Sequence, residues 1–262
     1  MPTVQEIEQA LFQWAPKELA QSWDNVGLLV GEPGRVVTKI LVALDVTPEV
    51  VREATEMGAE LIVAHHPVMN IHWHERELRT LRSDTQLGNL LMSLVKAGVS
   101  AICMHTNLDA AQGGVNDALA ESLGLEEIGP LSEEDGIGRV GLLPEPMDLQ
   151  DFLSLVRSRL RPNGIRFTGG GKIVHRVAVG GGACGDYISL AAARGCDTFV
   201  TADLKYNQFL DAGAMGLNLI DAGHFPTEDV VCPVLIQRLE NTFPGLKIVK
   251  SASHREAVQY YV

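Results

Sequence analysis

Apolar residues recur near the start of this chain with a helical spacing. Between Val4 and Trp14 they fall three or four positions apart, as on one face of a helix. Just before this run, Thr3 and Glu6 have the spacing of a capping box, in which each residue satisfies a backbone donor at the helix start. The pattern predicts a first helix over about residues 3–14.

Continuous apolar runs then alternate with amphipathic segments. The runs at 39–46, 60–67 and 99–106 have the pattern of strands that are covered on both faces. The segment after the first run has Pro48 in its first turn and Gly58 at its end, which are start and stop signals of a helix. This alternation predicts an α/β fold with a largely parallel sheet. The expected helices are residues 48–58, 84–97 and 116–124.

The second half of the chain repeats this scheme. Strand patterns at 175–182 and 196–204 flank a helical pattern at 187–195. Aligning Gly58 with Gly195 superimposes the two β-α-β segments without a gap, which indicates a duplication, although any two α/β units share this outline. The expected lobes are residues 1–125, with the C-terminal segment as a candidate addition, and residues 126–262, joined through a proline-containing connection at 126–150.

Charge and cysteine usage narrow the class of protein. The net charge is −12, and no basic run is present to displace counterions from phosphates, which argues against a nucleic-acid partner. No apolar stretch approaches the ~20 residues that span a bilayer, so no membrane association is expected. The start of the chain lacks the pattern of a signal peptide, and the four cysteines form no C-x-x-C pair. A cytoplasmic protein is therefore expected.

A histidine pair stands where the second strand ends. His65 and His66 directly precede Pro67. Ligands of open α/β sheets gather outside the carboxyl ends of the strands, so this edge is the expected functional edge. Because neighbouring strand residues point to opposite faces, the two rings either converge through a turn at Pro67 or serve two neighbouring ions.

Two further strand ends carry histidine and carboxylate together. His105 and Asp109 follow one strand, and His224 and Glu228 follow its counterpart in the second half, both with the spacing H-x-x-x-[D/E]. Imidazole and carboxylate without thiolate suit Zn, Fe, Mn, Co or Ni rather than a closed structural zinc site. The sequence therefore predicts a metal site built at strand ends.

Four motifs resemble the NIF3 family, whose members are also known as GTP cyclohydrolase 1 type 2 homologues. They are SWDNVGLLVG (22–31), HHP (65–67), HTNLDAAQGGVNDALAE (105–121) and IDAGHFPTE (220–228). The resemblance implies a dinuclear metal centre in a cleft between two similar lobes, and a toroidal homohexamer. By position, it implies the ligands His65, His66, Asp109, His224 and Glu228, with Glu228 bridging both ions.

The implied cofactor is a pair of divalent ions, with Zn, Fe or Mn as the candidates. Two ions ~3.5–4 Å apart lower the pKa of a bridging water and hold both the attacked centre and the leaving group. A metal-dependent hydrolase that acts on a nucleotide or another phosphate-bearing small molecule is expected, as in the GTP cyclohydrolase type 2 name. The alternative is metal storage or delivery, or a scaffold without turnover.

Other residues near the expected site have two interpretations each. His105 either orients a ligand carboxylate or acts as a general acid or base, and Lys205 assists proton transfer or holds a phosphate. Asp203 faces the cleft or belongs to a solvated turn. Ala202 and Asn207 replace a Gly and a His that many family members have, which puts the substrate or the rate in question.

Several remaining features point to structure as readily as to chemistry. Asp24 is a partner of a ligand or part of a turn, and the glycine-rich segment 180–185 is a phosphate loop or a tight strand-to-helix turn. Four further histidines outside these motifs are expected on the surface or on an exposed loop: His72, His74, His175 and His254.

Overall fold

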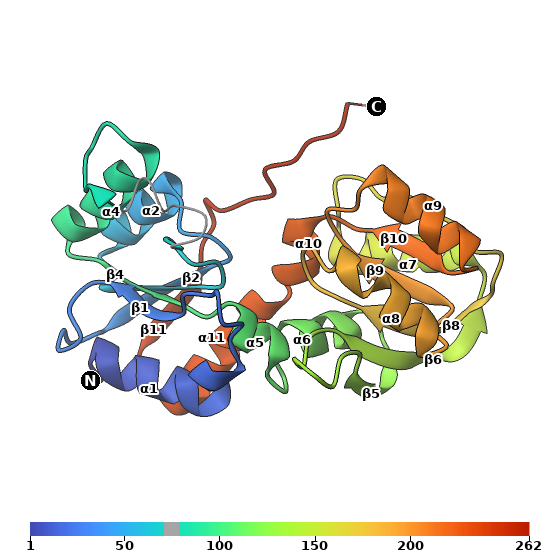
Figure 1. The fold of residues 1–262 in the computed structure, drawn as a ribbon. Coiled ribbons are helices and arrows are strands. Elements are labelled where there is room, and N and C mark those ends of the chain that lie inside the picture. Colours follow the sequence, from blue (N-terminus) through green and yellow to red (C-terminus); the bar gives the residue numbers. More distant parts are fainter. Residues whose placement is uncertain (71–78, 262) are drawn as a thin grey trace. The chain divides into compact units, whose positions relative to one another are not determined.

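The computed structural model describes residues 1–70 and 79–261, so His72 and His74 lie outside the described residues. The chain forms two compact units (Figure 1). Unit 1 comprises Met1–Ala111 and Cys232–Arg255, and unit 2 comprises Gln112–Val231 and Glu256–Val262. The sequence analysis placed the boundary between the lobes at 125/126, whereas the first boundary between the units falls after Ala111. The units divide earlier because the helix α6 (Val115–Ser122) packs on the strands of unit 2.

Unit 1 is a five-stranded sheet with helices on both faces. Its strand order is β1-β4-β3-β2-β11, and only β1 runs antiparallel to its neighbour. Helices α2 and α4 cover one face, and α1 and α11 lie on the other (Figure 1). The strands are Gly27–Val30 (β1), Lys39–Ala43 (β2), Leu61–Ala64 (β3), Ser100–Cys103 (β4) and Lys247–Lys250 (β11); the main helices are Val4–Trp14 (α1), Pro48–Met57 (α2), Gln86–Ala97 (α4) and Val231–Thr242 (α11).

The helices α1 and α2 of unit 1 begin or end at the residues that the sequence predicted. Thr3 and Glu6 form the capping box of α1. Helix α2 begins with Pro48 in its first turn and ends at Gly58, which adopts the left-handed conformation that closes a helix. The central strands are buried along their whole length, as continuous apolar runs require when helices cover both faces.

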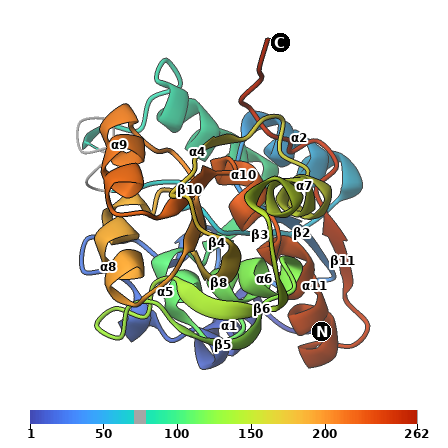
Figure 2. The ribbon, with the colours of Figure 1, turned by 90° about the vertical axis from the view of Figure 1, so that its right-hand side faces the viewer.

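Unit 2 is a six-stranded sheet with the order β5-β6-β8-β9-β10-β7. Its centre, β8-β9-β10, is parallel, and the flanking strands are antiparallel. Figure 2 shows α8 and α9 on one side of this sheet, with α6 and α7 on the other. The strands are Glu126–Pro130 (β5), Arg139–Met147 (β6), Arg166–Thr168 (β7), Val174–Val179 (β8), Thr198–Thr201 (β9) and Asn218–Asp221 (β10); the helices include Leu149–Leu160 (α7), Ile188–Ala193 (α8) and Tyr206–Ala214 (α9).

The interpretation of residues 126–150 as a connection was wrong. They form β5 and β6, which pair with each other in an antiparallel ladder. The prolines of β6 lie at 144 and 146, where its pairing with β8 is interrupted between Leu142 and Met147. Proline is compatible with a strand at such a place because no ladder hydrogen bond is required of it.

The predicted repeat of a β-α-β-α-β scheme is present in both units. The segment β2-α2-β3-α4-β4 in unit 1 corresponds to β8-α8-β9-α9-β10 in unit 2. Strands β3 and β9 begin at Leu61 and Thr198, three residues after the aligned glycines Gly58 and Gly195. The mixed α/β class with two sheets is therefore confirmed. None of the described helices has the length and apolar character needed to cross a membrane.

Candidate metal centre

The histidine pair converges through a turn at the end of β3. The backbone N–H groups of His65 and His66 both donate to the carbonyl of Leu44, at 3.1 and 2.9 Å. Sharing one acceptor bends the chain out of the extended strand geometry, and the two rings come to lie with centroids 4.9 Å apart. His65 is fully buried, and its Nδ1 donates to the Met104 carbonyl at 2.7 Å.

Asp45 supports His66 from the end of β2. Its Oδ1 lies 2.7 Å from Nδ1 of His66, and its Oδ2 lies 2.9 Å from Nε2 of His254. Burial raises the pKa of Asp45, but the hydrogen bonds from the two imidazoles outweigh burial and hold the pKa well below its usual range. Asp45 is therefore an ionised acceptor, and His254 is a partner of the site rather than the surface residue that the sequence predicted.

Asp24 supports His105 in a similar way. His105 is the residue before the short helix α5 (Thr106–Ala110), and its Nδ1 lies 2.9 Å from Oδ1 of Asp24. The other oxygen of Asp24 accepts the Thr106 N–H at 3.0 Å and also the Thr106 hydroxyl. Burial raises the pKa of Asp24, yet these hydrogen bonds hold it at about 2. Of the two sequence interpretations, the structure supports Asp24 as a partner of the histidine site.

Unit 1 thus gathers three imidazoles at one sheet edge. Ligand atoms of His65, His66 and His105 lie within 4.8 Å of one another. Nε2 of His65 also lies 3.6 Å from Oδ1 of Asp109. Four of the predicted or candidate residues of unit 1 are therefore neighbours, and His105 belongs to the cluster as closely as the two residues of the HHP motif do.

In unit 2, His224 lies between two carboxylates. Its Nδ1 is 2.7 Å from Oδ2 of Asp203, and its Nε2 is 3.0 Å from Oε2 of Glu228. Burial lowers the pKa of His224, but the two carboxylates more than offset burial and raise it to about 11. The expected closeness of His224 and Glu228 is therefore present. Asp203 faces His224 from a left-handed backbone conformation at the end of β9.

The glycine-rich segment is a tight turn packed on this pair. The N–H of Gly181 donates to the Asn116 side chain at 2.9 Å, and the N–H of Gly182 donates to the Thr227 hydroxyl at 3.0 Å. A Cβ on Gly182 would lie 2.2 Å from Oε1 of Glu228 and 3.0 Å from Nε2 of His224. These amides serve protein side chains, so the turn interpretation holds, and glycine is required for the close approach to Glu228.

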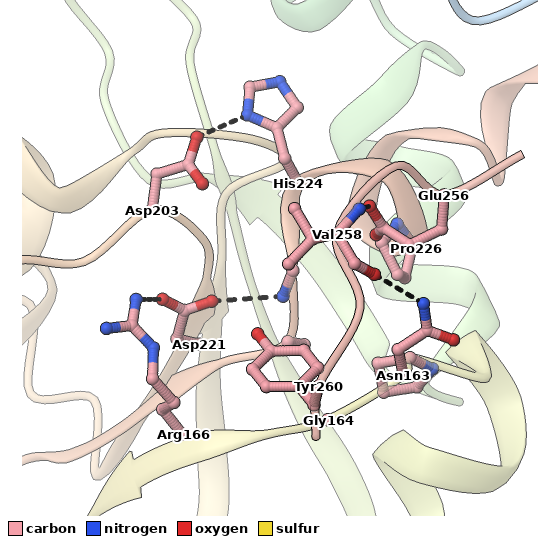
Figure 3. A pocket seen from close by; sticks show the side chains of 13 residues that line it. Asn163, Gly164, Arg166, Asp203, Asp221, His224, Pro226, Glu256, Val258 and Tyr260 are labelled. Carbon is pink, nitrogen blue, oxygen red and sulfur yellow. Dashed lines mark hydrogen bonds and ion pairs between the residues drawn. The ribbon is translucent and has the colours of Figure 1, made fainter.

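A pocket of about 310 Å³ in unit 2 opens beside His224 (Figure 3). Asp221 is one of the residues that line it, where it pairs with Arg166 and accepts the Gly223 N–H at 3.1 Å. The guanidinium of Arg166 also donates to the Leu204 carbonyl at 3.0 Å. The C-terminal segment supplies one wall of the pocket through Glu256, Val258 and Tyr260.

The remaining predicted residues lie around the start of α9. Lys205 is exposed at the first position before α9, and it is not among the described residues that line the pocket beside His224. Asn207 is exposed on the same helix, whereas Ala202 is fully buried at the end of β9. Helix α10 (His224–Glu228) begins at His224, so that Pro226 falls within its first turn, where no intrahelical donor is needed.

The residues of both units have the chemistry that a divalent metal requires. Each of His65, His66, His105 and His224 places Nδ1 against an oxygen acceptor. A carbonyl or carboxylate accepts only, so Nδ1 carries the proton, and in His65, His66 and His105 Nε2 keeps the lone pair that binds metals. Nε2 of His224 faces Glu228, and a metal ion bound between them would replace the proton that this carboxylate favours there. Metal bonds of about 2.0–2.2 Å place neighbouring ligand atoms roughly 3.0–3.5 Å apart. The two Nε2-to-carboxylate distances, 3.0 and 3.6 Å, are of this size.

Comparison with known proteins gives one consistent family. The family model described as Duf34/NIF3 (NGG1p interacting factor 3) matches residues 2–256. A Clostridium perfringens protein named GTP cyclohydrolase 1 type 2 homolog is 39% identical over 229 residues, which cover 85% of this chain and 84% of that protein. A Streptomyces coelicolor protein of the same name is 36% identical and covers 92% of this chain and 86% of its own length.

Solved structures agree with this result. The Bacillus cereus protein described as related to NIF3 has a TM-score of 0.90 at 26% identity, over 100% of this chain and 99% of that chain. Staphylococcus aureus protein SA1388 has a TM-score of 0.89 at 27% identity, over 99% of each chain. The fold is therefore shared over the full length with proteins of this group.

Proposed function

This chain belongs to the Duf34/NIF3 family, and on that premise we propose that it holds two divalent metal ions and hydrolyses a nucleotide or another phosphate-bearing small molecule. The proposed ligands are His65, His66, Asp109, His224 and Glu228, with Glu228 shared by both ions. The observation that carries the proposal is that the imidazoles of His65, His66 and His224 all hold Nδ1 against an oxygen, so that Nε2 is the ring nitrogen directed to a metal ion.

The ligand chemistry limits the choice of ion. The ligand set contains imidazole and carboxylate but no thiolate, which favours Zn, Fe or Mn in a site with open positions. Three neutral imidazoles and two carboxylates leave two divalent ions with a net charge of about +2. This local charge attracts anionic substrates that the overall charge of −12 repels, so the site itself selects the substrate.

Bound divalent ions would supply Lewis acidity and lower the pKa of a coordinated water. The chain's own residues would handle the proton and the substrate. His105, whose Nδ1 is fixed by Asp24, is the proposed general acid or base, because its ring lies 5.2 Å from that of His65. Lys205 is the second candidate, either for proton transfer or for holding a phosphate from the exposed start of α9.

The pocket beside His224 is the proposed position for the part of the substrate that does not react. Arg166 is preorganised there by Asp221, by the Leu204 carbonyl and by the Phe209 ring, whose centroid is 5.5 Å from the guanidinium carbon. A guanidinium that is already oriented binds a planar or anionic group at a lower entropic cost. The relatives' name, GTP cyclohydrolase 1 type 2 homolog, makes GTP the first compound to test.

The test is metal analysis of the purified protein, followed by a hydrolysis screen with each ion. We expect close to two ions per chain, and activity on a nucleotide or phosphoester that depends on added Zn, Mn or Fe. Absence of bound metal under any loading condition would contradict the proposal. If the loaded protein hydrolyses nothing in a broad panel but transfers its ions to an apo-enzyme, metal storage or delivery replaces hydrolysis.

A homohexamer in the cytoplasm completes the proposal. Helix α9 buries only Ala212, while Tyr206 and Leu210 are 78% and 56% exposed. Exposed apolar side chains on one helix favour an interface, and closed rings leave no such surface open. Light scattering should return about 170 kDa, six times the 28.3 kDa chain. A 28 kDa particle at micromolar concentration would contradict the assembly.

A further inference from the structure

The segment that follows β11 is fastened to helix α2 by a single carboxylate. Glu53 accepts the hydroxyls of Ser251 and Ser253 at 2.5 and 2.6 Å. It also accepts the N–H groups of Ala252 and Ser253, at 2.9 and 3.1 Å. His254 comes next, and its own N–H donates to the Ser251 hydroxyl at 3.1 Å. The backbone of His254 is therefore held by its own hydrogen bond to Ser251 and by the contacts of Glu53 with the residues that precede it.

The ring of His254 reaches the carboxylate behind the histidine pair. Its side chain is 10% exposed, and Nε2 lies 2.9 Å from Oδ2 of Asp45. The other oxygen of Asp45 is 2.7 Å from Nδ1 of His66. One carboxylate thus accepts from two imidazoles, one on each oxygen.

We propose that His254 is a positioning residue for the metal site, which acts on His66 through Asp45. By donating from Nε2 to Oδ2, His254 stops the carboxylate from rotating and keeps Oδ1 against Nδ1 of His66. That contact holds the proton of His66 on Nδ1 and the metal-binding lone pair on Nε2. The inference rests on the proposed function, in which His66 is a ligand.

The geometry decides which tautomer His254 adopts. Nε2 also lies 3.2 Å from the backbone N–H of Asp45, which would require Nε2 to accept. The contact to the carboxylate is shorter and involves a charged acceptor, and such hydrogen bonds are roughly twice as strong as neutral ones. An unprotonated Nε2 would place two lone pairs against each other at 2.9 Å. Nε2 of His254 therefore carries a proton and donates.

A purely structural role for His254 predicts different results from a positioning role. If His254 only fastens the segment, removing Glu53, which accepts four donors from that segment, should do equal or greater harm to metal binding. If His254 acts on Asp45, what matters is a donor at the place of Nε2. Glutamine provides one, because its amide nitrogen lies about as far along the side chain as the imidazole Nε2.

The experiment compares Zn²⁺ affinity, measured by competition with a chelator, and the visible spectrum of the Co²⁺-loaded full-length protein. We expect His254→Ala to weaken binding of one ion by about 10–100-fold, the usual range for partners of metal-ligating histidines, and to change the Co²⁺ spectrum. His254→Gln should bind within about threefold of wild type, and so should the control His175→Ala on β8. Glu53→Ala should have a smaller effect than His254→Ala.

Three results would overturn the inference. The first is wild-type affinity with an unchanged Co²⁺ spectrum in His254→Ala. The second is a Glu53→Ala variant that binds metal as weakly as His254→Ala or more weakly. The third is a His254→Gln variant that binds as weakly as His254→Ala, or, if His254→Ala does not fold, as weakly as Glu53→Ala. A thermal melt of each variant separates lost folding from lost binding. If the wild-type protein binds neither Zn²⁺ nor Co²⁺, the proposed function itself fails, which is a distinguishable outcome.

Discussion

The same strand ends carry different chemistry in the two units. After β3, unit 1 has His65 and His66, whereas after β9 unit 2 has Ala202 and Asp203 at the corresponding positions. Unit 1 gathers three imidazoles, and each holds its proton on Nδ1 through a hydrogen bond to an oxygen acceptor. Unit 2 places a single imidazole between two carboxylates. Imidazoles therefore predominate in the cluster of unit 1, where Asp109 is the neighbouring carboxylate, whereas carboxylates outnumber the imidazole in unit 2.

The H-x-x-x-[D/E] spacing hides a further difference between the units. His105 is the residue before helix α5, whereas His224 is the first residue of helix α10. The two histidines are therefore one position out of register in otherwise similar turns. Equal spacing after two related strands therefore does not place two residues in equivalent positions, and the distinct role proposed for His105, as a general acid or base, needs a test of its own.

Replacing His105 should have the largest effect, and it tests that distinct role. We expect His105→Ala to lower turnover by about 10²–10⁴-fold while the metal content stays close to wild type, because general acid or base catalysis contributes about this much. Lys205→Ala should also lower turnover, with its metal content intact. The measurement is steady-state kinetics on the substrate found by the screen, beside metal analysis. Loss of metal from His105→Ala would make it a ligand instead.

The charge that unit 2 supplies is tested by Glu228→Ala. Since Glu228 is the proposed shared ligand, its loss should weaken metal binding by more than about 100-fold, the upper range for partners that do not themselves bind the metal. Metal content after dialysis measures the effect. Glu145→Ala, at an exposed carboxylate of the same unit, serves as the control and should keep its ions. An equal loss of metal from His105→Ala would contradict the ranking of the two residues.

The close approach of the glycine turn can be separated from its backbone conformation. Gly182 and Gly195 both have positive φ, +62° and +73°, but only Gly182 would place a Cβ against Glu228 and His224. Alanine in this region costs roughly 1–2 kcal/mol. Both Gly182→Ala and Gly195→Ala should therefore lose stability in denaturant melts, and only Gly182→Ala should also lose at least about tenfold in metal affinity. Normal metal binding by Gly182→Ala would show that the turn does not limit the site.

The smallest expected effect concerns pH in unit 1. Burial raises the pKa of Glu53, but hydrogen bonds from Ser251, Ser253 and the intervening backbone hold it at about 2, against an ordinary value of 4.5. A lowered pKa stabilises the folded state above the ordinary value, and this contribution is lost as the pH falls. The difference in unfolding free energy between wild type and Glu53→Gln should therefore be constant above about pH 5 and shrink below about 4.5. A difference in unfolding free energy that does not change with pH would contradict the lowered pKa of Glu53.

Local signals account for most of the fold that the sequence predicted. The capping box of α1, the glycine at the end of α2 and the buried strands follow from contacts within a few residues, and such contacts are visible in a sequence. The pairing of β5 with β6 was missed because their prolines suggested a loop, and only the interrupted ladder with β8 explains how a strand tolerates them.

The partners of the histidines were harder to predict because they come from distant parts of the chain. Asp45 stands at the end of a predicted strand, so the rule that directed attention to His65 could have found it as well. His254 is 209 positions from Asp45, and no local pattern distinguishes it from a surface histidine. Asp203 faces His224 from a left-handed backbone conformation, and the neighbouring residues in the sequence do not predict that conformation. The residues that hold the histidines in place are brought to them by tertiary structure, whereas the proposed ligands themselves fall in short sequence motifs.

The interleaving of the two units also constrains synthesis on the ribosome. Almost all of unit 2 is one uninterrupted stretch, Gln112–Val231, whereas the sheet of unit 1 is closed by β11, which pairs with β2 only after residue 250 has been made. Until then, the apolar strand β2 is the bare edge of a nascent sheet, and such edges recruit other chains. We expect unit 2 to complete its fold first. Unit 1 remains without its last strand until the end of synthesis, so it is the part of the nascent chain that is most prone to aggregation.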